Sequence, residues 1–137
     1  MPNTKAVGVA YSDPEFESVT VTGAITGASV SVTGSLNGTM LDLNAPVTKT
    51  ASFTLGDTEN FVVCNGAGSI TVTFPTASAN TGRVVWIKTI AAQTVVSASS
   101  NVKPIGSNTA GTAILAASAG AWAMLVCDGT DWIVMSS

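Results

Sequence analysis

Residues 123–135 read AMLVCDGTDWIVM, and this stretch decides the fold class. Two short apolar runs, AMLVC and WIVM, flank Asp128-Gly129-Thr130, and turn residues between two such runs predict a β-hairpin. The longer apolar stretch 113–127 is too short to span a membrane and is interrupted by Ser118 and Gly120, so it predicts two buried strands around a turn.

The same signals recur along most of the chain, whereas no window shows sustained helical periodicity with caps. Asn65-Gly66, with Gly68, predicts a second hairpin, and Trp86, Trp122 and Trp132 are expected to anchor the core where they point inward. Strands are expected at 52–55, 60–64, 69–74, 83–89, 93–98, 112–116, 122–127 and 132–135. The prediction is an all-β chain with an eight-stranded β-sandwich or jelly-roll-like domain over residues 47–137.

The composition points to a covered surface. The chain is 46% hydrophobic and 9% charged, whereas a typical soluble domain is about 25% charged. Its formal net charge of −3 lies entirely in residues 1–46, and the remainder is neutral. Nothing here supplies the basic face that a nucleic-acid binder needs. We therefore expect copies or protein partners to cover much of the surface, and we expect neither nucleic acid nor a membrane as a partner.

Two segments precede the main domain. Residues 1–16 are expected to form an extended arm, in which Pro14 prevents regular strand pairing at its position. The N-terminal residues contain no apolar h-region, so no secretory signal is expected. Residues 17–46 contain two eleven-residue copies, ESVTVTGAITG and ASVSVTGSLNG, and then a linker. Each copy predicts a strand, a glycine corner and a second strand with one apolar side. The apolar residues of the copies are Val19, Val21, Ile25, Val30, Val32 and Leu36.

These copies have two interpretations. Repeat units bury their apolar faces against neighbours, so three chains winding the copies around a common axis would form a core that none forms alone. The six apolar residues are then self-association residues of a homotrimer. Alternatively, both copies add strands to the sheet of the main domain.

The residues offer little chemistry. The chain has no histidine, so the usual general base, metal ligand and triad partner are absent, and we expect no enzyme, no cofactor and no metal site. Asp13, Glu15 and Glu17 could serve a glycosidase or bind calcium, but a solvated acidic arm is the simpler interpretation. Asp128 and Asp131 are expected to be turn residues.

Cys64 and Cys127 are the only cysteines. They are expected to be reduced core residues, although both lie at predicted strand ends, and a disulfide between neighbours stays open at this point.

Two stretches, SITVTFPTASANTGRVVWIKT and AWAMLVCDGTDWIVM, resemble the small β-sandwich modules of tailed-bacteriophage virion proteins. The marks of that family are a strand ending in proline, a Thr-Gly-Arg turn into a strand with lysine, and a closing Val-x-Asp-Gly-Thr-x-Trp hairpin. Here they fall at Phe74-Pro75, Thr81-Gly82-Arg83, Lys88 and 126–132. The front repeats also look like phage arms and stems.

The resemblance implies a structural role in a virion. The small size favours a capsid decoration (cement) protein, a homotrimer that binds the major capsid protein at capsomer junctions of the assembled head and stabilises it by mass action. The protein would be assembled in the host cytoplasm and lie on the outer capsid surface. The arm would contact the capsid through Val7, Val9, Tyr11 and Phe16. The alternative is a tail-fibre or receptor-binding module.

Overall fold

The structure, a computed structural model, describes residues 22–23 and 44–137. The predicted arm, with Val7, Val9, Tyr11 and Phe16, lies outside the described residues. The same holds for the self-association residues Val19, Val21, Ile25, Val30, Val32 and Leu36 and for the acidic residues Asp13, Glu15 and Glu17. The fold described below is that of residues 44–137.

Residues 44–137 form ten strands and one short 3-10 helix, with no α-helix among them. The strands are β1 Val47–Lys49, β2 Phe53–Thr54, β3 Phe61–Cys64, β4 Ile70–Thr73, β5 Val84–Thr89, β6 Val95–Ser97, β7 Val102–Lys103, β8 Ala113–Leu115, β9 Trp122–Cys127 and β10 Trp132–Ser136. The 3-10 helix, Ala77–Ala79, lies between β4 and β5.

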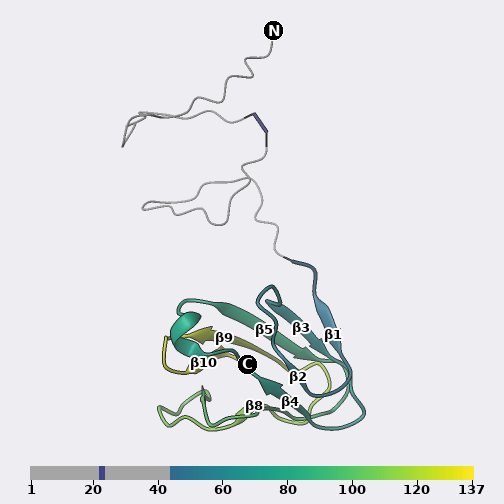
Figure 1. Ribbon diagram of the computed structural model, residues 1–137. Helices are drawn as coiled ribbons and strands as arrows, with labels where there is room; N and C mark the ends of the chain where they lie inside the picture. Colours follow the sequence, from purple (N-terminus) through teal and green to yellow (C-terminus); the bar gives the residue numbers. More distant parts are fainter. Residues whose placement is uncertain (1–21, 24–43) are drawn as a thin grey trace, which may run out of the picture. The chain divides into compact units, whose positions relative to one another are not determined.

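Two mixed sheets are built by a chain that alternates between them. The six-stranded sheet has the order β1-β3-β5-β9-β10-β7, and the four-stranded sheet has the order β2-β4-β6-β8. Strands β1, β3 and β5 are parallel neighbours in the first sheet, as are β2, β4 and β6 in the second. From β1 to β6 the chain therefore adds strands to the two sheets alternately. Each new strand pairs with the strand that was added to the same sheet just before it. Figure 1 shows β1, β3, β5 and β9 together in one layer, with β4 and β8 in another.

The last strands close this winding. β8 pairs antiparallel with β6, and β9 pairs antiparallel with β5. β10 then returns along β9 through the Asp128-Gly129-Thr130 turn, with Trp132 opposite Cys127. The hairpin predicted from residues 123–135 is thereby confirmed, as is the all-β class.

Two details of the sequence prediction were wrong. Every predicted strand overlaps an observed one, but the described residues hold ten strands, not eight, because β1 and β7 were not recognised. Asn65-Gly66 is not a hairpin turn, since it carries the chain from the six-stranded sheet to the other sheet. The resulting parallel pairs differ from a jelly roll, which is antiparallel.

One hydrophobic core lies between the sheets and draws on both of them. The strands alternate buried and less buried residues, so each sheet turns one set of side chains inward. Trp132 of β10 is fully buried, and its ring stacks on that of Phe74, which follows β4, with centroids 4.7 Å apart. This pair ties the closing hairpin of one sheet to the other sheet.

Successive turns of the chain stack tightly at the corner after β3. The Asn65 amide donates to the carbonyl of Lys49 at 2.8 Å, and the Gly66 amide donates to Oε1 of Gln93 at 2.9 Å. A Cβ on Gly66 would lie 2.8 Å from the backbone oxygen of Thr50. Gly66 is thus required by the close approach of the preceding turn, and the buried Gln93 connects it to the following one.

Gly66→Ala should therefore lower the free energy of unfolding by about 1–3 kcal/mol, because the new methyl group meets immovable backbone. Gly68→Ala is the matched control, since a Cβ there would meet no atom within 4 Å. The control should be neutral or slightly stabilising. Urea denaturation of both variants checks this, and equal stabilities would show that the corner does not constrain the fold.

An ion pair links the end of β1 to the loop between β2 and β3. Nζ of Lys49 lies 2.6 Å from Oε1 of Glu59, and Oε2 of Glu59 accepts the Gly56 amide at 2.9 Å. The hydrogen bond from Lys49, and then that from Gly56, hold the pKa of Glu59 below its usual value. Stability from this carboxylate is therefore present above the unfolded-state pKa and is lost as the pH falls through the folded-state pKa.

Glu59→Gln should reduce the free energy of unfolding by about 1 kcal/mol at pH 7, because the amide cannot replace the charged acceptor of Lys49. The difference from the parent protein should shrink as the pH falls below the ordinary glutamate range. Denaturant melts at pH 7 and in acid test this, and a difference that is independent of pH would contradict the assigned role.

Candidate interaction surface

The six-stranded sheet is apolar on the face that points away from the core. In β3, β5 and β9 the residues between the buried ones are apolar with one exception, Lys88. Strand pairing aligns them in three rows across the sheet. The rows are Val84, Val126 and Ile133, then Phe61, Trp86 and Met124, then Val63, Lys88 and Trp122. We call these nine residues the outer face.

Aromatic rings dominate the outer face. Phe61 and Trp86 stack with ring centroids 5.0 Å apart and planes 18° apart. Trp122 is 45% exposed. Of the three tryptophans expected to anchor the core where they point inward, only Trp132 does so, because Trp86 and Trp122 lie on the outer side of their strands.

A groove of about 300 Å³ is hollowed into one end of the outer face. Its walls include the side chains of Phe61, Trp86 and Trp122, and Pro46 lies at its rim just before β1. Lys88 is the only polar residue of its lining. With so few groups to orient a polar ligand, the groove suits apolar side chains better than a sugar or a nucleotide.

The four-stranded sheet presents a different outer surface. There Thr71 pairs with Val96 and Thr54 pairs with Thr73, all on the side away from the core. Threonine hydroxyls form hydrogen bonds with water, so their exposure is not unfavourable. Exposure of aromatic rings to water is unfavourable. The six-stranded sheet therefore has the more apolar of the two outer surfaces.

The size of the outer face is informative. With strands about 4.8 Å apart and rows about 6.6 Å apart, each residue covers about 32 Å², so the nine residues cover roughly 290 Å². The largest apolar patch on a typical soluble monomer covers a few hundred Å² and is often a binding site. The outer face is therefore the candidate functional site.

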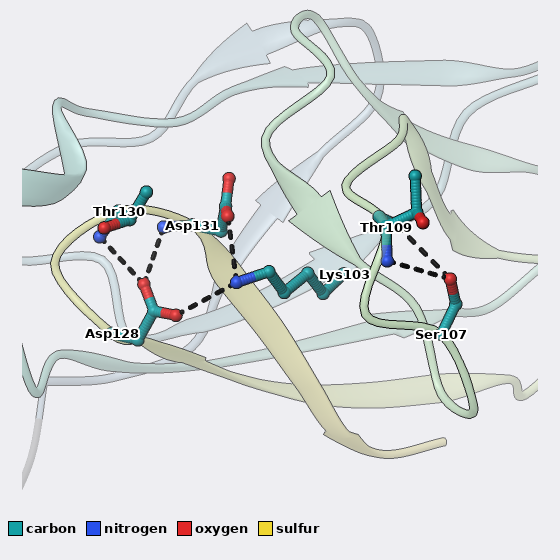
Figure 2. A network of polar contacts seen from close by, with 6 residues as sticks. All are labelled: Lys103, Ser107, Thr109, Asp128, Thr130 and Asp131. Carbon is teal, nitrogen blue, oxygen red and sulfur yellow. Dashed lines mark hydrogen bonds and ion pairs between the residues drawn. The ribbon is translucent and has the colours of Figure 1, made fainter.

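The remaining charged cluster is structural (Figure 2). Nζ of Lys103 lies 3.3 Å from Asp128 and 3.0 Å from Asp131. Oδ1 of Asp128 accepts the amides of Thr130 and Asp131 at 2.8 and 2.7 Å. The amides of Asp131 and Thr130 hold the pKa of Asp128 low, so its carboxylate stays ionised. These groups stabilise the β9–β10 turn and tie β7 to it.

The two cysteines are buried, and neither forms a disulfide. Cys64 is opposite Thr89, the last residue of β5, and this end of β5 lies beside the first residue of β9. Cys127 is the last residue of β9 and therefore lies at the other end of the strands. The geometry thus excludes the bridge that the sequence left open. Burial raises the pKa of the Cys64 thiol to about 11, so it stays protonated and unreactive at neutral pH.

Two of the motifs quoted for the phage resemblance, the Thr-Gly-Arg and Asp-Gly-Thr turns, meet at one end of the six-stranded sheet, whereas Lys88 lies towards the other end of β5. The Gly82 amide donates to the carbonyl of Cys127 at 2.8 Å, and Gly129, with φ of 94°, lies against Thr81. Arg83 donates to the carbonyls of Gly56 and Glu59. In this chain the Thr-Gly-Arg and Asp-Gly-Thr turns therefore support each other, and Arg83 holds the β2–β3 loop.

Within residues 22–23 and 44–137 no three His, Cys, Asp or Glu side chains gather as a metal site would require. The described part of the chain also contains no helix long and apolar enough to cross a bilayer. No family model, curated protein or solved structure matches the chain. The outer face is therefore the feature of the described structure that bears most directly on function.

Proposed function

We propose that this chain is a non-enzymatic capsid decoration (cement) protein of a tailed bacteriophage. In this proposal its two sheets form a β-sandwich, and a homotrimer binds the major capsid protein at capsomer junctions on the outer surface of the assembled head. The observation that supports it best is the outer face, an apolar surface with one lysine on a domain whose opposite sheet is threonine-rich. Such a face favours a subunit of an assembly over a free monomer.

The proposed mechanism is mechanical. Copies associate through apolar surfaces, and the N-terminal arm, with Val7, Val9, Tyr11 and Phe16, reaches over the capsid. Because binding occurs only to the assembled shell, it stabilises that shell by mass action. A surface poor in charge suits a particle crowded with copies, since like charges on neighbouring copies would repel.

Two measurements on the full chain and the virion test this proposal. Light scattering should give three times the monomer mass, and a quantitative gel of virions should show the chain in numbers comparable to the capsomer junctions. Deletion of residues 1–16 should leave the trimer intact and abolish its attachment to heads that lack the protein, because the arm supplies the capsid contacts.

A monomeric full chain that does not attach to heads would overturn the proposal. A few copies per virion together with binding to host cells would instead identify a tail-fibre or receptor-binding module. Undiminished attachment after the deletion would show that residues 1–16 are not the capsid contact.

A further inference from the structure

We propose that the eleven-residue repeats of residues 17–38 continue the two-sheet winding of the domain, and that the second repeat stacks on the free edges of β1 and β2 in its own chain. This inference goes beyond the proposed function and does not depend on it. Of the two interpretations that the sequence allows for the repeats, it selects the one in which they add strands to the domain. It follows from a third repeat, which lies inside the described structure.

The third repeat is residues 45–55, APVTKTASFTL. It aligns without a gap with the second repeat, ASVSVTGSLNG, and with the first, ESVTVTGAITG. Each alignment has four identical positions, which are Ala45, Val47, Thr50 and Ser52 for the second repeat and Val47, Thr48, Thr50 and Thr54 for the first. In all three repeats a valine is followed, six positions later, by a large apolar residue, which is Ile25, Leu36 or Phe53.

In the structure the third repeat forms one rung of the winding, which we define as a strand in each sheet and the corner between them. β1 lies in the six-stranded sheet, residues 50–52 form the corner, and β2 lies in the four-stranded sheet. Val47 and Phe53 pack against the core, whereas Thr48 and Thr54 are exposed. The first two repeats have apolar residues at both core-facing positions and Thr, Ser or Asn at both exposed ones, which is the pattern of a rung.

The first repeat carries a structural mark of the same corner. Residues 22–23 are the only described residues before 44, and they form a bend. In the alignment they correspond to residues 50–51, which form the bend between β1 and β2. The bend therefore falls at the same point of the repeat in both places.

The length of the repeat also fits a rung. Three residues, 50–52, carry the chain from one sheet to the other, between strands of three and two residues. Two such strands and two such corners use eleven residues, which is the period of the repeats. The second repeat is joined to β1 through residues 38–46, a longer stretch than residues 55–60, which return the chain from β2 to β3.

The described domain offers a place for the added rung. β1 and β2 are edge strands of the two sheets, and both belong to the first rung of the winding. The carbonyl of Lys49 accepts the amide of Asn65 beside β3, so the backbone groups of Thr48 point to the free edge. Open edges of this kind pair readily with further strands, and a short tether gives the second repeat of the same chain a high effective concentration there.

Disulfide formation in the full-length chain tests the stacking. Ser31 is the counterpart of Thr48, so Ser31→Cys combined with Thr48→Cys should place two thiols on neighbouring parallel strands, about 4.8 Å apart at Cα and within reach of a disulfide. Mild oxidation should then produce a bond within one chain, seen as a faster single-chain band on a non-reducing gel. The native Cys64 and Cys127 are buried, so they should not take part.

Thr20→Cys combined with Thr48→Cys is the matched control. These positions would be two strands apart, about 10 Å, so their disulfide should form at least about tenfold more slowly. All replaced residues correspond to the exposed position of Thr48, so circular dichroism melts should match the parent protein.

A disulfide between two chains would show that the repeats pair with a neighbouring molecule, and it would overturn the inference. Equal rates in the two variants, or no disulfide in either, would also overturn it, because the second repeat would then not lie beside β1. The proposed function is tested separately by copy number and attachment to heads, and it stands in each of these cases. If the inference holds, the trimer forms through surfaces other than the repeats.

Discussion

The constraint on which this structure depends is that its central strands are apolar on both sides. Val85 and Ile87 of β5 are buried in the core, while Val84 and Trp86 of the same strand belong to the outer face. The strands of a sheet with one solvent-exposed face normally alternate apolar and polar residues, whereas strands buried on both faces are apolar throughout. One covering layer is supplied by the four-stranded sheet of the same chain. In the proposed assembly, a partner supplies the other.

The winding of the chain explains how residues 44–137 form a six-stranded sheet together with a four-stranded one. Backbone pairing aligns the parallel neighbours β1, β3 and β5, and the corner after β3 lies so close to the preceding one that a Cβ on Gly66 would meet the backbone of Thr50. The β9–β10 hairpin then closes the sheet, and Trp132 anchors it in the core. The paired strands hold Phe61, Trp86 and Trp122 in register, so the proposed association would have a low entropic cost for ordering them.

The sequence predicted the strands well and their connections poorly, for physical reasons. Period-two alternation marks a strand whatever sheet it joins, and Asn65-Gly66 suits a corner between sheets as well as a hairpin. β1 and β7 were missed because breaker residues adjoin them, Pro46 before β1 and Pro104 after β7. The outer face was visible in the sequence, since alternate positions of VVWIKT and WAMLVC are largely apolar on both sides of the strand. Its tryptophans were interpreted as anchors of the core. Gln93 gave no signal, because its partner Gly66 is distant in sequence.

The central claim is that the outer face is covered when the protein assembles. Hydroxyl-radical footprinting of the full-length chain tests it directly, with Trp122 as the reporter and the buried Trp132 as the internal reference. Trp122 should be oxidised several-fold more slowly in concentrated solution than after dilution, while Trp132 stays protected in both. Equal, rapid oxidation of Trp122 at every concentration and on assembled particles would contradict the account.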